Sequence, residues 1–585
     1  MSASTGLIRG LTNYGDRDFA WFLRRSLAMS MGYSSEILAR PVVGIATSGG
    51  DFNSCHRTMP ELVTAVKRGV LVSGGLPLEF PTISLGEVFL NPTSMMFRNL
   101  MAIDVEEMIR SQPMDAVVLI GGCDKTVPAQ LMGATSAGIP AIQLVTGPMM
   151  TDRSGGERLG ACTDCRRFWA KYRRGEINET QVNEIGGHLA TTAGTCPVMG
   201  TASTMACIAE TLGVILPGTA TIPAVHADRL RAAEATGVEA VRLARNGTTL
   251  KDVITARSIE NALRVLLAIG GSTNAVIHLA AIAGRVGIQL SLARINEISD
   301  TTPVIVNLKP TGDHYMEDLQ AAGGVGAVLR ELANLLDLDC RDIAGNALKD
   351  RLSQPDTYVD RSIIRPLDHP FDPQGGLIAL FGSLCPDGAI LKRAAADPAL
   401  FEHEGRAVVF DGLNDLAERI DQPDLDVRPE DILVLKNAGP VAAEMPEAGY
   451  LPIPGKLARA GVKDMIRLSD ARMSGTAFGT IILHITPESA VGGPLSLVKN
   501  GDAIRLSVRD KRLDLLVDEG ELAKRRTQIQ PAPLPTRGWA GLYARSVQQA
   551  GLGCDFAFLT EAGFRERSPA NSGPLSKSLA IDTSK

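Results

Sequence analysis

The chain has 585 residues, of which 45% are hydrophobic and 21% charged, and its formal net charge is −6. This composition is typical of a globular protein with a sizeable core, and the length predicts at least two domains. The acidic balance and the aromatic content of 4% argue against nucleic acid as a partner. No apolar run reaches the ~18 residues of a membrane span, and the N-terminus lacks an apolar signal core. We therefore expect a cytoplasmic protein without a membrane partner, whose cysteines are ligands or core residues.

Short apolar runs in the first quarter of the chain predict buried strands at 40–47, 115–120 and 139–145. A helix-like stretch joins the last two, which is the strand–helix–strand unit of a parallel sheet covered by helices. Residues 226–285 are rich in Ala, Leu and Arg at helical spacing, so this segment predicts helices.

The character of the chain changes at 365–376, where prolines and glycines predict a domain boundary. Beyond it, short strand-like segments predominate and predict a compact, barrel-like domain. The predicted strands lie at 376–383, 406–412, 431–439, 463–470, 480–486, 502–508 and 512–518. We therefore predict an α/β fold with an N-terminal parallel-sheet domain over residues 1–370 and a C-terminal β-rich, barrel-like domain over 371–585.

The segment GGCDKTVPAQLMG, residues 121–133, carries the strongest chemical signal. The strand before it brings Cys123, Asp124 and Lys125 to the carboxyl edge of the sheet, where open α/β sheets bind ligands. A thiolate suits a soft metal and a carboxylate suits a hard one. On local spacing alone, a buried cysteine beside a surface ion pair explains the segment equally well.

Cys55 and Cys196 lie in similar turns rich in glycine, serine and threonine. Together with Cys123 they supply three thiolates from three loops, an incomplete cage that leaves one metal position open to substrate. Each cysteine taken alone is more often a small buried residue.

Several segments resemble one family, in the same order along the chain. The segments 123–133, 200–213, 268–288, 468–480 and 485–495 are similar to those of the dihydroxy-acid and phosphogluconate dehydratases. The sequences of SLGE (84–87) and DARMSGTAFGT (470–480) are more similar to the sugar-acid branch of this family, which includes the arabinonate and xylonate dehydratases.

The resemblance implies a hydro-lyase that dehydrates a 2,3-dihydroxy sugar acid to a 2-keto-3-deoxy acid, as a homodimer or homotetramer. It implies a 2Fe-2S cluster acting as Lewis acid together with Mg²⁺, although spacing alone does not separate 2Fe-2S from 4Fe-4S. A dihydroxy-acid dehydratase of branched-chain amino-acid biosynthesis is the alternative, because it shares the catalytic residues.

Residue by residue, the resemblance assigns the cluster to Cys55, Cys123 and Cys196. It assigns magnesium to Glu87, Asp124, Glu447 and a carbamylated Lys125. Carbamylation requires a neutral amine, which burial favours.

Ser474 matches the catalytic base and Thr476 a position near the substrate. A serine needs nearby positive charge to act as an alkoxide. Ser272 and Thr273, in the GGSTNA turn, are expected to line the substrate site because turn N–H groups can bind a carboxylate.

Other residues have simpler interpretations. Cys162 and Cys165 form a CxxC without a second CxxC, and the resemblance gives them no role, although a redox or zinc protein built on them is a rival hypothesis. His278 lies on an apolar helix and is predicted to be a core histidine whose ring nitrogens have hydrogen-bond partners. His56, beside Cys55, departs from the sugar-acid branch and is expected to shape the distal end of the substrate and not the metal site. The remaining cysteines, Cys207, Cys340, Cys385 and Cys554, are predicted to be core or incidental.

Overall fold

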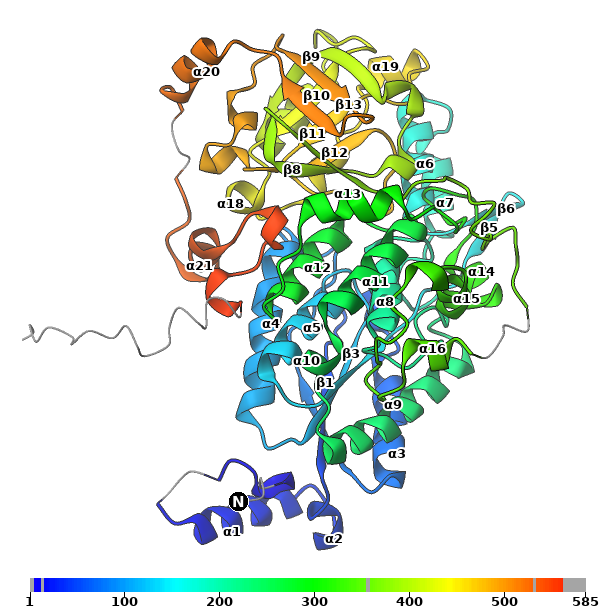
Figure 1. Ribbon diagram of the computed structural model, residues 1–585, viewed down its shortest axis with the longest axis vertical. Helices are drawn as coiled ribbons and strands as arrows, with labels where there is room; N and C mark the ends of the chain where they lie inside the picture. The colour runs from blue at the N-terminus through cyan, green and yellow to red at the C-terminus, as the bar shows by residue number, and fades with distance from the viewer. Residues whose placement is uncertain (1–4, 12–14, 354–357, 530–532, 561–585) are drawn as a thin grey trace, which may run out of the picture.

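The computed structural model describes residues 5–11, 15–353, 358–529 and 533–560. A helix-covered parallel sheet forms the lower part of the molecule, and a closed β-barrel, yellow-green to orange in Figure 1, lies above it. The predicted α/β fold with a C-terminal barrel is confirmed, whereas the domain division at residue 370 stays a prediction. Within the described ranges, no helix is both long and apolar enough to cross a membrane.

The sheet has the strand order β2-β1-β3-β4, and all of its pairings are parallel. Its strands are β1 (Val42–Thr47), β2 (Leu76–Pro81), β3 (Ala116–Gly121) and β4 (Ala141–Val145). β1, β3 and β4 confirm the predicted strands, and all their residues are buried, as a sheet covered on both faces requires. β2 was not predicted from the sequence, because its two prolines argue against a strand. It lies at the edge of the sheet, where a strand tolerates proline.

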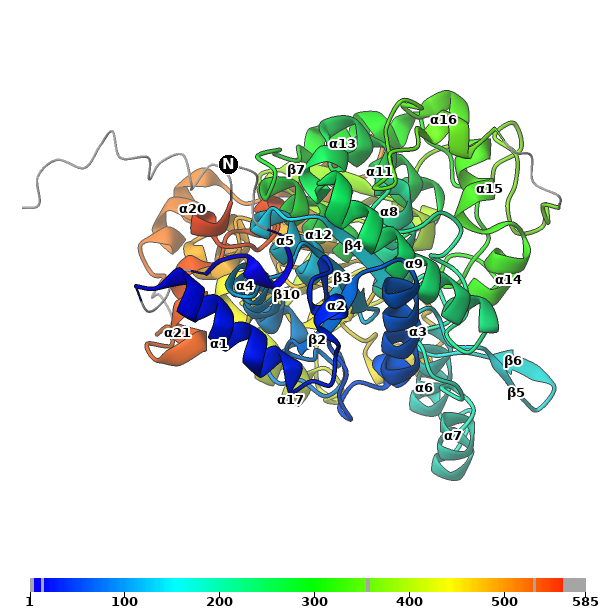
Figure 2. The ribbon, with the colours of Figure 1, turned by 90° about the horizontal axis from the view of Figure 1, so that it is seen from below.

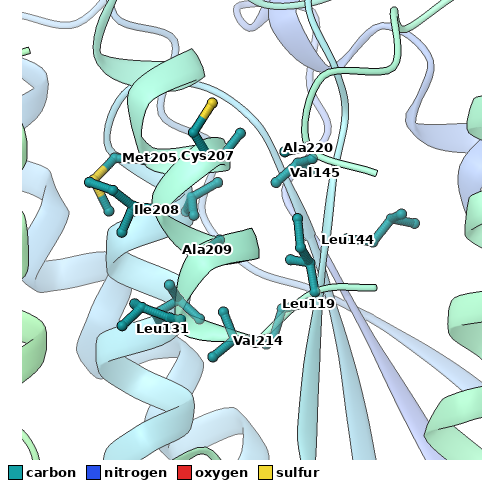
Figure 3. Packing of buried hydrophobic residues seen from close by; sticks show 14 of the residues in the cluster. Leu119, Leu131, Leu144, Val145, Met205, Cys207, Ile208, Ala209, Val214 and Ala220 are labelled. Atoms are coloured by element: carbon teal, nitrogen blue, oxygen red, sulfur yellow. The ribbon is translucent and has the colours of Figure 1, made fainter. Parts of the chain in front are cut away.

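Helices cover both faces of this sheet (Figure 2). α3 (Met59–Val72) and α9 (Ala227–Asn246) pack on one face, and α5 (Thr126–Ala137) packs on the other with α4 (Ser94–Ser111) beside it. Behind α5 lies α8 (Thr201–Leu212), whose Cys207 is fully buried in the apolar core drawn in Figure 3. The core prediction for Cys207 is confirmed, as it is for Cys385 and Cys554, whereas Cys340 is half-buried.

The remaining α-helices and strands of this region are shorter or more peripheral. They are α1 (Arg17–Met29), α2 (Ser35–Leu38), β5 (Asp152–Ser154), β6 (Glu157–Leu159), α6 (Thr163–Arg174), α7 (Glu179–Gly186), α10 (Leu250–Val253), α11 (Ala256–Ala268), α12 (Asn274–Gly284), α13 (Leu292–Asp300), α14 (Met316–Ala321), α15 (Gly324–Glu331) and α16 (Leu348–Arg351). α9 to α12 confirm the helices predicted within 226–285.

The barrel closes in the order β10-β11-β12-β8-β7-β14-β13-β9. Its strands are β7 (Ile378–Gly382), β8 (Cys385–Leu391), β9 (Glu402–Asp411), β10 (Ile432–Lys436), β11 (Arg467–Ser469), β12 (Ile481–Thr486), β13 (Ala503–Ser507) and β14 (Arg512–Leu515). Its α-helices are α17 (Gly412–Arg419), α18 (Pro440–Ala443), α19 (Gly455–Arg459), α20 (Glu519–Arg526) and α21 (Gly538–Ser546). All the predicted strands are present. β8 was missed because Pro-Asp-Gly near its start reads as a turn.

Several contacts fasten the barrel region to the α/β region, among them those made by Asn296 and Arg98. Asn296 of α13 exchanges two 2.9 Å hydrogen bonds with the backbone of Ala379 in β7. The chain after α21 returns to α4, where Arg98 donates to the carbonyls of Gly553 and Cys554 at 2.7 and 2.9 Å. These contacts hold β7 and the segment after α21 against helices of the α/β region.

Candidate active site

The candidate site lies where the strand order of the sheet reverses. β1 pairs with β2 on one side and with β3 on the other, so the connections leaving β1 and β2 run in opposite directions. Such a switch point opens a crevice beyond the carboxyl ends of the strands, where α/β sheets bind ligands. The loops that leave β1, β2 and β3 carry Cys55, Glu87 and the Cys123–Lys125 run.

Three carboxylates from three segments meet in this crevice. Glu87, Asp124 and Glu447 each offer an oxygen atom, and these atoms all lie within 4.8 Å of one another. Glu447 begins a 3₁₀ turn on the barrel side, so both halves of the chain contribute. Hard oxygen donors at this spacing fit a magnesium ion.

The pKa values of these carboxyl groups differ widely. Burial, with the neighbouring anions Glu87 and Glu447, raises the pKa of Asp124 to about 7. Burial likewise raises the pKa of Glu447. For Glu87 burial acts in the same direction, but Lys125 and Arg472 outweigh it and lower the pKa to about 2. The site therefore contains one firmly ionised carboxylate and a group that titrates near neutral pH.

Arg472, to which the sequence analysis gave no role, joins the carboxylates. Its Nη1 lies 2.6 Å from Oε1 of Glu447, and its Nη2 lies 3.0 Å from Oε1 of Glu87. Nε donates to the carbonyl of Met445 at 2.7 Å, and Nη2 also donates to Oγ1 of Thr93 at 3.0 Å. This buried guanidinium compensates two of the anions and fixes their orientation.

Lys125 is fully buried, and its Nζ lies 3.4 Å from Oε2 of Glu87. Nζ has no hydrogen-bond partner among the described residues. Glu87 is the ion-pair partner of Lys125, and the unused hydrogen-bonding capacity of Nζ fits a lysine that takes up a modification when the metal site is occupied. A carbamate oxygen there would face the same crevice as the carboxylates.

The predicted cluster cysteines gather beside the carboxylates. The thiols of Cys55 and Cys123 are in hydrogen-bond contact. Cys196 lies close enough to Cys55 and Asp124 for their charges to contribute to its raised pKa. Contact with Cys55, together with burial, raises the pKa of Cys123. Soft sulfur donors in one place fit an iron–sulfur cluster.

Cys162, to which the resemblance gives no role, lies next to this group of thiols. Its Sγ lies 3.7 Å from Sγ of Cys196. It also contacts Cys165, and the hydrogen bonds with Cys165 and Cys196 hold the pKa of Cys162 well below its usual value.

His56 supports the Cys123 loop, so the expectation that it shapes the distal end of the substrate does not describe its contacts. Nδ1 lies 2.7 Å from the carbonyl of Ser48, and Nε2 accepts from the backbone N–H groups of Gly122 and Cys123 at 2.9 and 3.1 Å. Burial lowers the pKa of His56 to about 4, which keeps Nε2 an acceptor at neutral pH. Its position directly after Cys55 was the available sequence signal.

The turn that carries Ser474 packs against the GGSTNA segment. A Cβ on Gly475 would lie only 2.6 Å from Oγ of Ser272, so the approach requires glycine. Ser474 is buried, and its Oγ is 2.9 Å from Oγ1 of Thr476. Ser272 is hydrogen-bonded to Thr201 and positions the turn.

Two neighbouring groups have unused hydrogen-bonding atoms. Thr273 is fully buried, and its hydroxyl has no partner among the described residues. His278 is buried as predicted but not satisfied, because Nδ1 lies 3.1 Å from Arg98 while Nε2 has no described partner. Burial, with Arg98 and Lys125 nearby, lowers the pKa of His278 well below its usual value.

A cleft of about 510 Å³ opens beside the thiols. Its lining includes Arg166, Arg173, Arg174 and Lys463, and no carboxylate from the part of the chain that the structure describes. Arg173 and Arg174 have acidic partners outside the lining. Arg166 stacks over the ring of Tyr450, 4.8 Å from its centroid, and has no ion-pair partner within 4 Å among the described residues. The Nε of Arg166 is buried without a described partner, so this cleft offers a cation to an oxygen-rich ligand.

Comparisons with known proteins agree with this geometry. A family model described as dihydroxy-acid/6-phosphogluconate dehydratase N-terminal matches residues 40–351, and its C-terminal counterpart matches residues 362–554. L-arabonate dehydratase of Azospirillum brasilense is 44% identical over 96% of this chain and 98% of its own. 6-deoxy-6-sulfo-D-gluconate dehydratase of Pseudomonas putida is 43% identical, covering 90% and 91%. A dihydroxy-acid dehydratase of Acetivibrio thermocellus is 35% identical, covering 90% and 96%.

Proposed function

Because this chain belongs to the dihydroxy-acid/6-phosphogluconate dehydratase family and is a hydro-lyase, we propose that it converts a sugar acid to a 2-keto-3-deoxy acid. One observation carries the proposal: the three carboxylates within 4.8 Å of one another lie beside the gathered thiols. Hard and soft donor sets side by side fit two different metal centres. A homodimer or homotetramer and a cytoplasmic location remain predictions.

Magnesium would be held by Glu87, Asp124, Glu447 and carbamylated Lys125, and a 2Fe-2S cluster by Cys55, Cys123 and Cys196. When bound, the magnesium ion polarises the carboxylate and 2-hydroxyl of the substrate, and the cluster supplies a Lewis acid for the leaving 3-hydroxyl.

Ser474, as its alkoxide, takes the proton from C2 of the substrate and becomes a neutral hydroxyl. Its Oγ is 2.9 Å from the hydroxyl of Thr476, which can donate to the alkoxide before the proton is transferred. Thr163 holds the same turn through a 3.1 Å bond to the carbonyl of Thr476. The 3-hydroxyl leaves as water by taking this proton from Ser474, which restores the alkoxide, and the enol that remains tautomerises to the ketone.

The cleft around Arg166 favours a sugar acid over the branched-chain alternative. A guanidinium without a described acceptor is better matched by the distal hydroxyl groups of an aldonic acid than by the apolar end of 2,3-dihydroxyisovalerate. The relatives named for sugar acids are also more similar, at 43 and 44% identity against 35%.

The test is an anaerobic assay of keto-acid formation from a panel of aldonic acids and 2,3-dihydroxyisovalerate. We expect turnover of at least one aldonic acid and a lower kcat/KM for 2,3-dihydroxyisovalerate. Preference for 2,3-dihydroxyisovalerate would favour the alternative, and no keto acid from any of them would contradict the proposal.

A further inference from the structure

The cleft beside the thiols adjoins the candidate active site. One of its walls is α6, whose first residue, Thr163, donates a 3.1 Å hydrogen bond to the carbonyl of Thr476 in the turn of the proposed base. The opposite wall includes Tyr450, which ends the 3₁₀ turn that Glu447 begins. A sugar acid whose carboxylate end is held at the three carboxylates can therefore extend its other end along this cleft.

The charged side chains that line the cleft are all positive. Among the described residues, the lining contains four cations and no carboxylate. Arg173 and Arg174 are paired with acidic residues outside the lining, at 2.6 and 2.5 Å. Arg166 and Lys463 line the cleft without an ion-pair partner within 4 Å in the described part of the chain. Two positive charges are therefore left for a ligand to neutralise.

Arg166 is placed to bind a ligand group directly. Its guanidinium stacks on the ring of Tyr450, and stacking leaves the N–H groups at the edge of the guanidinium plane free to donate. Nε is buried and has no hydrogen-bond partner among the described residues, so a ligand oxygen would satisfy a donor that is otherwise left unused. The planar fork of an arginine fits two oxygen atoms of one carboxylate or phosphate group.

The surroundings of these cations favour a charged ligand group over a hydroxyl. Pro452, Ile453, Val462 and Phe478 line the same cleft. Apolar side chains lower the local dielectric constant, which strengthens the attraction between opposite charges. Hydrogen bonds between two charged groups are also about twice as strong as those between neutral groups. An uncharged end of a sugar acid would leave both cations uncompensated.

We propose that Arg166 determines specificity by binding a second anionic group, a phosphate or a carboxylate, at the end of the sugar acid away from the reacting carbons. The inference rests on the proposed function and narrows its substrate class to acids that are negatively charged at both ends. Lys463, exposed at the cleft, adds a second positive charge. In this role Arg166 selects the substrate and takes no part in the elimination.

The experiment measures kcat and KM for matched pairs of sugar acids in the anaerobically purified, magnesium-loaded enzyme. Both members of a pair have the same configuration, but one is an aldonic acid and the other also carries a terminal phosphate or a terminal carboxylate. The two kinds of terminal group separate a phosphate site from a carboxylate site. We expect the member with the charged end to have a kcat/KM at least ~10-fold higher in the parent enzyme.

Arg166→Met removes the charge and the donors. For the member with the charged end, kcat/KM should fall by ~10- to ~100-fold, the scale for losing a hydrogen bond between charged groups. The fall should lie mainly in KM, because the contact is the same in the ground state and the transition state. For the aldonic acid the change should be less than ~3-fold. Lys171→Met is the control, since that cation of α6 lies over the ring of Phe168 and does not line the cleft.

Two further measurements guard against misfolding and against a wrong choice of sugar. If Arg166→Met lowers the melting temperature, Arg166→Lys, which keeps the charge without the fork, replaces it and should lose part of the preference. Calorimetric titration with inorganic phosphate, in a chelator and without substrate, needs no turnover. We expect a dissociation constant at least ~10-fold higher in Arg166→Met than in the parent.

An equal or higher kcat/KM for the aldonic acids in the parent enzyme would overturn the inference while leaving the proposed function in place. Equal losses for both members of a pair in Arg166→Met would overturn it as well, because Arg166 would then act on the reacting end. Keto acid from no pair would contradict the proposed function instead. In that case equal phosphate affinity of the parent and Arg166→Met, or no phosphate binding by the parent, would overturn the anion site too.

Discussion

Arg472 and Glu87 lie 385 residues apart in the sequence, yet Nη2 of the arginine is 3.0 Å from Oε1 of the glutamate. The arginine follows barrel strand β11, and the glutamate follows sheet strand β2. This contact, with the 2.6 Å contact to Glu447, makes the two halves of the chain share one charge network. The carboxylates can therefore be held in place before any cation arrives.

Removing this cation should destabilise the metal-free protein. We expect Arg472→Met to lower the free energy of unfolding by about 3–5 kcal/mol, the usual effect of leaving a buried charge without its partner. The pKa of Glu87 is about 2 in the folded protein, below its ordinary 4.5, so its contribution is present above pH 4.5 and lost as pH falls toward 2. In Arg472→Met the folded pKa of Glu87 should lie closer to 4.5, so this acid-dependent loss of stability should be smaller than in the parent.

Denaturant unfolding in a chelator, between pH 3 and 7, measures both effects. Arg505→Met is a suitable control, because the Arg505–Glu404 pair is exposed. Equal unfolding free energies for Arg472→Met and the parent would show that the network contributes no stability.

Magnesium affinity should depend on pH through Asp124. Its folded pKa of about 7 lies above the ordinary 3.8, so the folded protein retains a proton there that magnesium must displace. Below pH 7 the affinity should fall about tenfold per pH unit, and above pH 8 it should level off. Because Asp124 holds its proton more tightly in the folded protein than in the unfolded chain, the free energy of unfolding of the metal-free protein falls as pH rises from about 4 to about 7.

Calorimetric titration of magnesium at pH 6, 7 and 8 checks this dependence. Lys125→Arg serves as a control for the carbamate, because arginine stays protonated and cannot take up carbon dioxide, so its magnesium binding should be weaker at every pH. An affinity independent of pH between 6 and 8 would contradict a raised pKa of Asp124 at the magnesium site.

Ser474→Ala tests the assignment of the base. Turnover should fall at least ~10²-fold, the scale for loss of a positioned general base, while iron and magnesium contents stay unchanged. Ser496→Ala is the control, since that hydroxyl only bonds the carbonyl of Gly493. Near-normal turnover in Ser474→Ala, with both metals retained, would place the base elsewhere.

His56→Ala tests the support of the Cys123 loop. The variant leaves the N–H groups of Gly122 and Cys123 without their acceptor, each at a cost of about 1–3 kcal/mol. Because the folded pKa of His56 is about 4, below 6.5, the parent loses this stability only as pH falls below about 6.5. Melting curves at pH 7.5 and 5.5 should show His56→Ala less stable, with less of this acid dependence. Melting curves for the variant that match the parent would contradict the role.

The sheet and the barrel were predictable because buried strands are marked by apolar runs between turns. β2 and β8 were not predictable, because their prolines and glycine favour turns in a sequence-based prediction. Pairing with neighbouring strands overrides that preference and makes both segments strands. The three predicted cysteines and three carboxylates do gather at one place. The contacts of Arg472 and Cys162 with the site were not predicted, because their partners come from distant segments of the chain. The spacing of residues along the sequence does not show which distant segments meet in the fold.

The metal content of the active, anaerobically purified protein is the most direct test of the central claim. We expect about two irons per chain, no zinc, and keto-acid formation from an aldonic acid that ceases when iron is removed and returns when the cluster is rebuilt with magnesium present. Full activity in protein that contains zinc, or that contains neither iron nor magnesium, would contradict it.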